Sequence, residues 1–186
     1  MSIENLIKRL QNIMRQDAGV DGDAQRIAQI VWIIFLKVYD AKEEIWEFHD
    51  DYYESIIPEN LRWREWAVDN KDGQAITGEE LLSFVNDELF PTLKNLEVDE
   101  TTEKRSLIVK EVFEDAFNYM KDGTLLRQVI NVIDEIDFTE AQERHSFNDI
   151  YETILKDLQS AGKSGEFYSP RPTTSFISEM LNPKIG

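Results

Sequence analysis

The sequence predicts a mainly α-helical fold. Apolar residues recur at steps of three and four through most of the 186 residues, which is the spacing of helices with one buried face. Capping boxes, in which a threonine precedes a Glu or Gln by three positions, begin two of these segments at Thr77 and Thr139. A chain of this length is expected to form one domain, or one domain and the beginning of a second.

Two helices are predicted at the amino-terminal end. The first follows Ser2, a favourable capping residue, and carries apolar residues from position 3 to position 14. The second begins at Asp23 and extends to about position 48. Residues 30–36 are apolar without interruption, which is typical of a helix that is buried on every side. We therefore expect this stretch to form the centre of the core.

The next segment, residues 49–74, does not follow the helical spacing. It contains Pro58 and, further on, the run Leu-Arg-Trp-Arg-Glu-Trp at positions 61–66. This run alternates in a way that would suit a short strand near residues 61–66. Two indole rings and two guanidinium groups would also suit stacking on nucleic-acid bases. The candidates for DNA contact are Arg62, Trp63, Arg64 and Trp66. In the alternative interpretation the segment is a structural lid over the helical core, since tryptophan mostly serves packing.

The third and fourth helices are predicted after this excursion. The third begins at Thr77, and Pro91 inside it is expected to kink or split the helix because proline removes a backbone hydrogen bond. The fourth is expected to cover about residues 102–120. The apolar side chains expected to face the core from this fourth helix are Leu107, Ile108, Val112, Phe113 and Phe117.

Two later boundaries complete the domain plan. Thr124 is expected to cap a fifth helix that extends to about position 136, and a further helix begins at Ser146 and ends at Gly162. After Gly162 the residues become glycine- and proline-rich and favour extended backbone. We therefore expect a helical domain over residues 1–161, with a linker and the beginning of another domain over residues 162–186.

Composition restricts the classes of function. The net charge is −17, from 37 acidic and 20 basic residues, and affinity for nucleic acid comes largely from basic side chains, so strong duplex DNA binding by this chain alone is not expected. The acidity suits solubility, contact with a basic partner, or mimicry of DNA. There is no cysteine, neither histidine has a partner at metal-ligand spacing, and the longest apolar run has seven residues against about 20 for a membrane span. No metal site and no membrane contact are expected, and the location is expected to be cytoplasmic.

One segment carries a resemblance to a known family. The chain reads Gly-Glu-Phe-Tyr-Ser-Pro-Arg over residues 165–171, followed by a predicted helix and a break at Asn182. This resembles the Gly-x-Phe/Tyr-Phe/Tyr-Thr-Pro-Arg segment of modification (M) subunits of type I restriction–modification systems and related adenine-N6 DNA methyltransferases. Ser169 stands where the family usually has threonine. The predicted buried helix, which reads Ile-Phe-Leu-Lys-Val-Tyr-Asp over residues 34–40, and the Arg and Trp after it extend the resemblance to the whole chain.

The resemblance implies a cofactor, S-adenosylmethionine, in the complete protein. In the family this segment lines the pocket for the methionine end of the cofactor, where a hydroxyl and backbone amides suit a carboxylate and an aromatic ring suits a sulfonium. A rigid linker is the alternative role. The residues carried over to the cofactor site are Glu166, Phe167, Tyr168, Ser169, Pro170 and Arg171.

The resemblance also implies partners and an incomplete catalytic set. The family's glycine-rich cofactor loop and its Asn-Pro-Pro-Phe/Tyr motif do not occur in these residues, so no catalytic residue is assigned and this part alone is expected to be inactive. The implied partners are a specificity subunit, a second M subunit, a restriction subunit and, within the complex, duplex DNA. A free-standing helical interaction module and an acidic DNA-mimicking inhibitor remain as alternatives.

Overall fold

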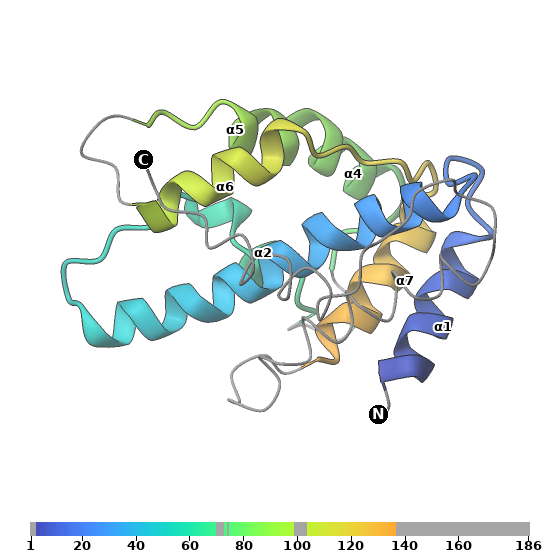
Figure 1. Ribbon diagram of the computed structural model, residues 1–186, viewed down its shortest axis with the longest axis horizontal. Helices are drawn as coiled ribbons and strands as arrows, with labels where there is room; N and C mark the ends of the chain where they lie inside the picture. The colour runs from blue at the N-terminus through green and yellow to red at the C-terminus, as the bar shows by residue number, and fades with distance from the viewer. Residues whose placement is uncertain (1–2, 70–72, 74, 99–103, 137–186) are drawn as a thin grey trace, which may run out of the picture.

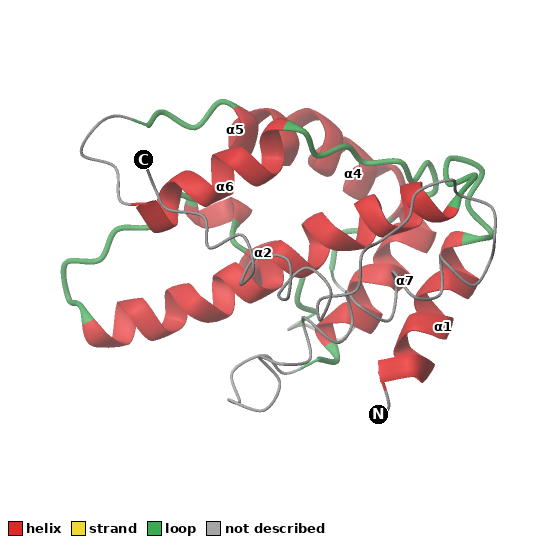
Figure 2. Cartoon of the chain, viewed as in Figure 1, coloured by secondary structure: helices red, strands yellow, loops and turns green. Residues whose placement is uncertain are grey.

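A computed structural model describes residues 3–69, 73, 75–98 and 104–136, and all of its regular elements are helices (Figure 2). The mainly helical prediction is therefore confirmed. The predicted helix from position 146 to 162 and everything after it lie outside the described residues. The elements, in chain order, are α1 (Ile3–Met14), α2 (Asp23–His49), the 3-10 helix η1 (Glu59–Leu61), α3 (Trp63–Trp66), α4 (Gly78–Ser83), the π-helix η2 (Phe84–Leu89), α5 (Phe90–Lys94), α6 (Lys104–Glu114) and α7 (Gly123–Asp134).

Helix α2 runs the length of the molecule and organises the core (Figure 1). Helix α7 packs against α1, α2 and α4, while α6 packs against α5. Five of the seven residues at 30–36 are buried and the other two are half-buried, as the uninterrupted apolar run predicted. Trp32 meets the ring of Phe90 at 5.1 Å, and Phe90 in turn meets Phe113 at 5.3 Å. These edge-to-face contacts join α2, α5 and α6 into one core.

The strand expected near residues 61–66 is not formed. Residues 59–61 make a 3-10 turn and residues 63–66 a single helical turn instead. The turn buries Leu61, Trp63 and Trp66 together, and the Trp66 Nε1–H donates to the Leu61 carbonyl oxygen at 3.1 Å. Within the described residues there is no neighbouring strand to satisfy an extended backbone, and a lone strand is not stable in water. Helical spacing therefore accounts for the apolar residues better than alternation.

Pro91 neither ends nor splits the third predicted helix, because the turn before it widens. Residues 84–89 form a π-helix, and the Phe90 N–H donates to the Val85 carbonyl, five residues back. The prolines of α-helix interiors remove one hydrogen bond and press on the preceding turn. A wide turn makes room for that ring, so α4, η2 and α5 follow one another without a break.

The fourth predicted helix is shorter than expected and two of its apolar residues face outward. Helix α6 ends at Glu114, and both Ile108 and Phe117 are exposed. The chain leaves the helix because the loop that follows is bonded into the core. The Gln29 Nε2 donates to the Asn118 Oδ1 at 3.0 Å, and the Gln29 Oε1 accepts from the Tyr119 N–H at 2.9 Å. Buried amides of this kind require partners, and here they hold the loop rather than a further helical turn.

Helix α7 is capped by a different residue from the one predicted. The Asp122 carboxylate accepts from the backbone N–H groups of Thr124 and Leu125 at 2.8 and 3.0 Å. Aspartate is among the best N-cap residues, and its charge also suits the positive end of the helix dipole. Thr124 therefore lies inside the first turn, not at the cap.

Candidate functional site at the end of helix α2

The two tryptophans of the candidate DNA-contact segment face the core. Trp63 and Trp66 are buried, with ring centroids 5.6 Å apart. The Trp63 Nε1–H donates to the Asp134 carboxylate at 2.9 Å, which connects α3 to the end of α7. With both indoles packed and hydrogen-bonded, neither ring offers a free face, so base stacking would require the segment to leave this position.

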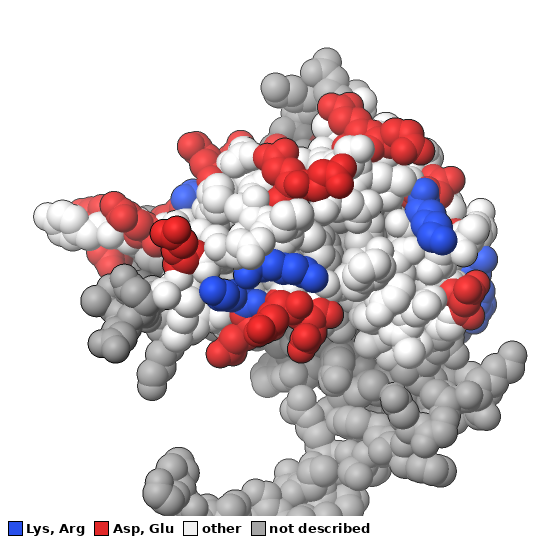
Figure 3. All heavy atoms as spheres, turned by 90° about the horizontal axis from the view of Figure 1, so that it is seen from above, with Lys and Arg blue, Asp and Glu red and all other residues white. Residues whose placement is uncertain are grey.

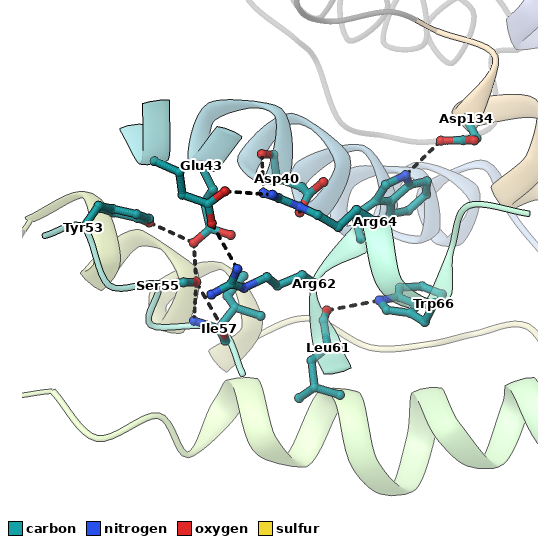
Figure 4. Close-up of polar contacts among 12 residues, drawn as sticks. Asp40, Glu43, Tyr53, Ser55, Ile57, Leu61, Arg62, Arg64, Trp66 and Asp134 are labelled. Atoms are coloured by element: carbon teal, nitrogen blue, oxygen red, sulfur yellow. Dashed lines mark hydrogen bonds and ion pairs between the residues drawn. The ribbon is translucent and has the colours of Figure 1, made fainter. Parts of the chain in front are cut away.

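The two arginines of the same segment are held by acids of α2. The Arg64 Nε donates to the Asp40 Oδ1 at 2.9 Å, and the Arg64 Nη1 donates to the Glu47 Oε2 at 2.8 Å. The Arg62 Nη1 donates to the other Glu47 oxygen at 3.0 Å. Figure 4 shows these guanidinium groups turned toward α2. The local positive charge is therefore neutralised within the fold.

A buried carboxylate continues this cluster toward the loop after α2. Glu43 is fully buried, and its Oε1 accepts hydrogen bonds from the Tyr53 hydroxyl at 2.8 Å and from the Ser55 hydroxyl (Figure 4). The Ser55 oxygen in turn accepts from the Ile57 N–H at 3.0 Å. One carboxylate thus fixes the chain reversal that brings residues 50–57 back along the helix.

Burial sets the electrostatics of the cluster. Removal from water raises the pKa of Glu43 above its ordinary value, although the hydroxyls of Ser55 and Tyr53 partly oppose this. Burial likewise raises the pKa of Asp40, against the opposing effect of Arg64. Burial alone would lower the pKa of Arg64, but its bonds to Asp40 and Glu47 outweigh that and raise it. Arg64 thus remains charged and holds the carboxylates of Asp40 and Glu47 in place.

The contacts of this arrangement connect parts of the fold to one another. No group of three or more potential metal-ligating side chains was found in the part of the chain that the structure describes. The effect of the arrangement is to attach the last three turns of α2 to residues 50–66. Of the two interpretations of the Arg–Trp segment, this geometry favours the structural lid, while DNA contact by these four residues stays a prediction.

The acids of α2 were not singled out from the sequence. Asp40, Glu43 and Glu47 are spaced by three and four residues, so they share one face of the helix. A row of acids on the helix that precedes an Arg-x-Arg sequence is a signal that could have paired the two segments. The cofactor-binding candidates at residues 166–171 lie outside the described residues. Within those residues, no helix has the length and apolar character needed to cross a membrane.

The fold and site therefore define the class of the chain, a helical domain in which ion pairs between α2 and residues 62–64 brace the fold. Comparison with known proteins agrees with this class. The family model described as the HsdM N-terminal domain matches residues 3–133, and the model described as N-6 DNA Methylase matches residues 142–186. The chain belongs to the HsdM N-terminal domain family.

Individual relatives lead to the same family. The chain is 58% identical over all 186 residues to the methylase subunit of the type I restriction enzyme EcoEI of Escherichia coli, and it spans 37% of the length of that relative. A crystal structure assigned as the modification subunit of a type I restriction enzyme from Vibrio vulnificus matches 97% of this chain and 40% of its own, with TM-score 0.80 and 35% identity.

A second solved structure, of a type I R-M system and concerned with its complex assembly and conformational transition, contains a chain that matches with TM-score 0.76 and 31% identity. That match covers 99% of this chain and 36% of the other. The residues described above thus correspond to the N-terminal part of type I methylase subunits.

Proposed function

We propose that the protein containing this chain is the methylase subunit of a type I restriction–modification system, which transfers a methyl group from S-adenosylmethionine to adenine N6 in DNA. The observation that carries the proposal is the 58% identity to a type I methylase subunit over every residue of the chain. The match of residues 142–186 to the N-6 DNA Methylase model supports it. The same matches favour a methylase part over a free-standing interaction module or a DNA mimic.

The cofactor site of the proposal rests on the donor set at residues 166–171. The rings of Phe167 and Tyr168 suit a sulfonium cation, and the Ser169 hydroxyl and Arg171 guanidinium suit a carboxylate. These residues would hold the methionine end of S-adenosylmethionine, which supplies the methyl group. The glycine-rich loop that would hold the rest of the cofactor does not occur in these 186 residues.

For the helical domain we propose a role in assembly and in closing the complex around DNA. The net charge of the chain, −17, opposes binding to DNA. The two arginines of the Arg-x-Arg sequence at 62–64 are already paired with acids. Contact with protein is therefore the better supported role. The proposed partners are the specificity subunit, a second methylase subunit and the restriction subunit, with duplex DNA held by the assembled complex in the cytoplasm.

A methylation assay tests the proposed activity. The full-length subunit is mixed with the specificity subunit of its own system, DNA and S-adenosylmethionine carrying a labelled methyl group. We expect label in N6-methyladenine only when both subunits are present. An assembled complex that transfers no label to adenine would contradict the proposed reaction. A subunit that methylates fully with residues 1–136 deleted would contradict the proposed role of the helical domain.

A further inference from the structure

The end of α2 and the loop after it carry two large aromatic side chains in water. Phe48 is 83% exposed and Tyr52 is 92% exposed, and Ile45, one helical turn before Phe48, is exposed as well. We call Ile45, Phe48 and Tyr52 the aromatic tip. In Figure 1 this end of α2 and the loop after it lie at the far left, away from α1 and α7. Single exposed apolar residues are ordinary, but several that lie close together, as these three do along the chain, are typical of a contact surface.

The aromatic tip is held in a fixed position. On the opposite side of the same turns, Glu43 binds the Tyr53 and Ser55 hydroxyls, and Glu47 binds two arginines. The Trp46 ring packs between those of Tyr39 and Tyr53, each at 5.7 Å. The Tyr52 N–H donates to the Asp50 carboxylate at 3.0 Å. The backbone that presents Phe48 and Tyr52 is therefore ordered before any partner arrives, which reduces the entropy lost on binding.

The surroundings of the aromatic tip are acidic. Of the six acids between positions 43 and 54, Glu43 and Glu47 face inward, whereas Glu44, Asp50, Asp51 and Glu54 are exposed. No lysine or arginine occurs between those positions. In Figure 3 acidic side chains flank white atoms at the projecting left end of the molecule. An apolar centre with a charged rim is the usual anatomy of a protein interface.

We propose that the aromatic tip docks into an apolar cleft rimmed by lysine and arginine on a different protein subunit. The acidic rim decides the partner's chemistry, because opposite charges across an interface steer association and like charges oppose it. DNA is a polyanion and is repelled by this rim. A symmetric contact between the aromatic tips of two copies would bring acid against acid. This inference rests on the proposed function, since it names the surface that the assembly role would use.

Site-specific cross-linking tests the location of the contact. The full-length subunit carrying the photo-reactive residue p-benzoylphenylalanine in place of Phe48 is assembled with the purified specificity and restriction subunits of its system and with DNA. We expect a covalent product with one of those two subunits, at a segment containing apolar residues beside lysine or arginine. Products only with the same chain, with a second methylase subunit or with DNA, or no product, would overturn the proposal. The same probe in place of Phe117 is the control and should give no such product.

Affinity measurements supply a second readout. Truncating well-buried aromatic anchors commonly costs tenfold or more in affinity, so Phe48→Ala with Tyr52→Ala should weaken binding to the cross-linked subunit by about tenfold or more. Phe117→Ala is the matched control, since Phe117 is 60% exposed on another loop, and should leave affinity within about twofold. Asp50→Asn with Asp51→Asn should reduce the salt dependence of binding. Unchanged affinity in the double aromatic variant, with normal thermal unfolding, would overturn the proposal.

The two proposals fail in different ways. If the wild-type complex methylates adenine but the aromatic variants bind their partners normally, the aromatic tip is not the docking surface and the proposed function stands. If the wild-type complex assembles and does not methylate adenine, the proposed reaction is wrong whatever the cross-links show.

Discussion

Arg64→Ala should destabilise the 186-residue chain by removing the partner of a buried carboxylate. The Asp40 side chain is 9% exposed and that of Arg64 25%. The substitution removes charge-assisted hydrogen bonds of 2.9 Å to Asp40 and 2.8 Å to Glu47, and it leaves Asp40 without an ion-pair partner among the described residues. Breaking a fully buried pair costs about 3–5 kcal/mol, and solvent at the guanidinium reduces this. We expect a loss of about 2–3 kcal/mol.

Urea denaturation followed by circular dichroism measures this loss, and a thermal melt should show a Tm lower by about 5–10 °C for a chain of this size. Arg9→Ala is the matched control. It also removes a short ion pair, Arg9–Glu135, but both of those side chains are largely exposed, so little measurable change is expected.

A double variant separates lost charge pairing from lost packing. If the buried charge of Asp40 causes the loss, Arg64→Ala combined with Asp40→Asn should be more stable than Arg64→Ala alone, because the neutral amide costs less to bury. The reasoning is refuted if Arg64→Ala is no more damaging than Arg9→Ala, or if the second substitution restores nothing.

Three further substitutions test the core, the buried acid and a close helix contact. Ile34→Asp puts a charge into the fully packed part of α2 and should unfold the chain, since an unpaired buried charge costs several kcal/mol; a normal melting curve would refute the core assignment. Burial raises the pKa of Glu43, so the folded state binds the proton of this carboxyl more tightly than the unfolded state does. The free energy of unfolding should therefore fall as the pH rises from the ordinary pKa of a glutamate toward the raised pKa of Glu43. Glu43→Gln should lack this fall. Urea titrations between pH 4 and 8 measure the free energy of unfolding of the wild-type chain and the variant, and the same pH dependence in both would contradict the prediction. A Cβ on Gly123 would lie 1.8 Å from the Gly78 carbonyl oxygen, whereas one on Gly22 meets nothing within 4 Å, so Gly123→Ala should cost about 1–3 kcal/mol and Gly22→Ala less; equal melting temperatures would be the contrary result.

The spacing of apolar residues predicted those features of the fold that are set within a single helix. The uninterrupted apolar run at 30–36 led directly to the buried centre of α2, and five described helices begin close to where caps and turns indicated. Features that depend on two distant segments were missed. Whether residues 61–66 form a strand or a turn depends on what lies beside them, and the end of α6 depends on amides that Gln29 supplies from α2.

The candidate site shows the same division. Arg62 and Arg64 were noticed for their charge, but the charge that matters is that of Asp40 and Glu47, about 20 residues earlier in the chain. An isolated Arg-Trp sequence is equally consistent with a nucleic-acid contact and with an internal brace. Only the three-dimensional pairing separates these, because it shows where the positive charge is already neutralised. Residues 166–171 lie outside the described residues, and their cofactor role stays a prediction.

The π-helix η2 also bears on which insertions and deletions this domain tolerates. A π-turn holds one more residue than an α-turn of the same kind, and each residue turns an α-helix by about 100°. Phe90 and Leu93, which follow this wider turn, are both buried. Deleting one residue between Phe84 and Leu89 would restore ordinary α-helical bonding, yet it would rotate α5 away from Trp32 and Phe113. The shorter helix would have regular hydrogen bonding but would lose the packing of α5 against the core. Insertions or deletions of one residue here are therefore expected to disrupt the domain more than the same changes in the loops.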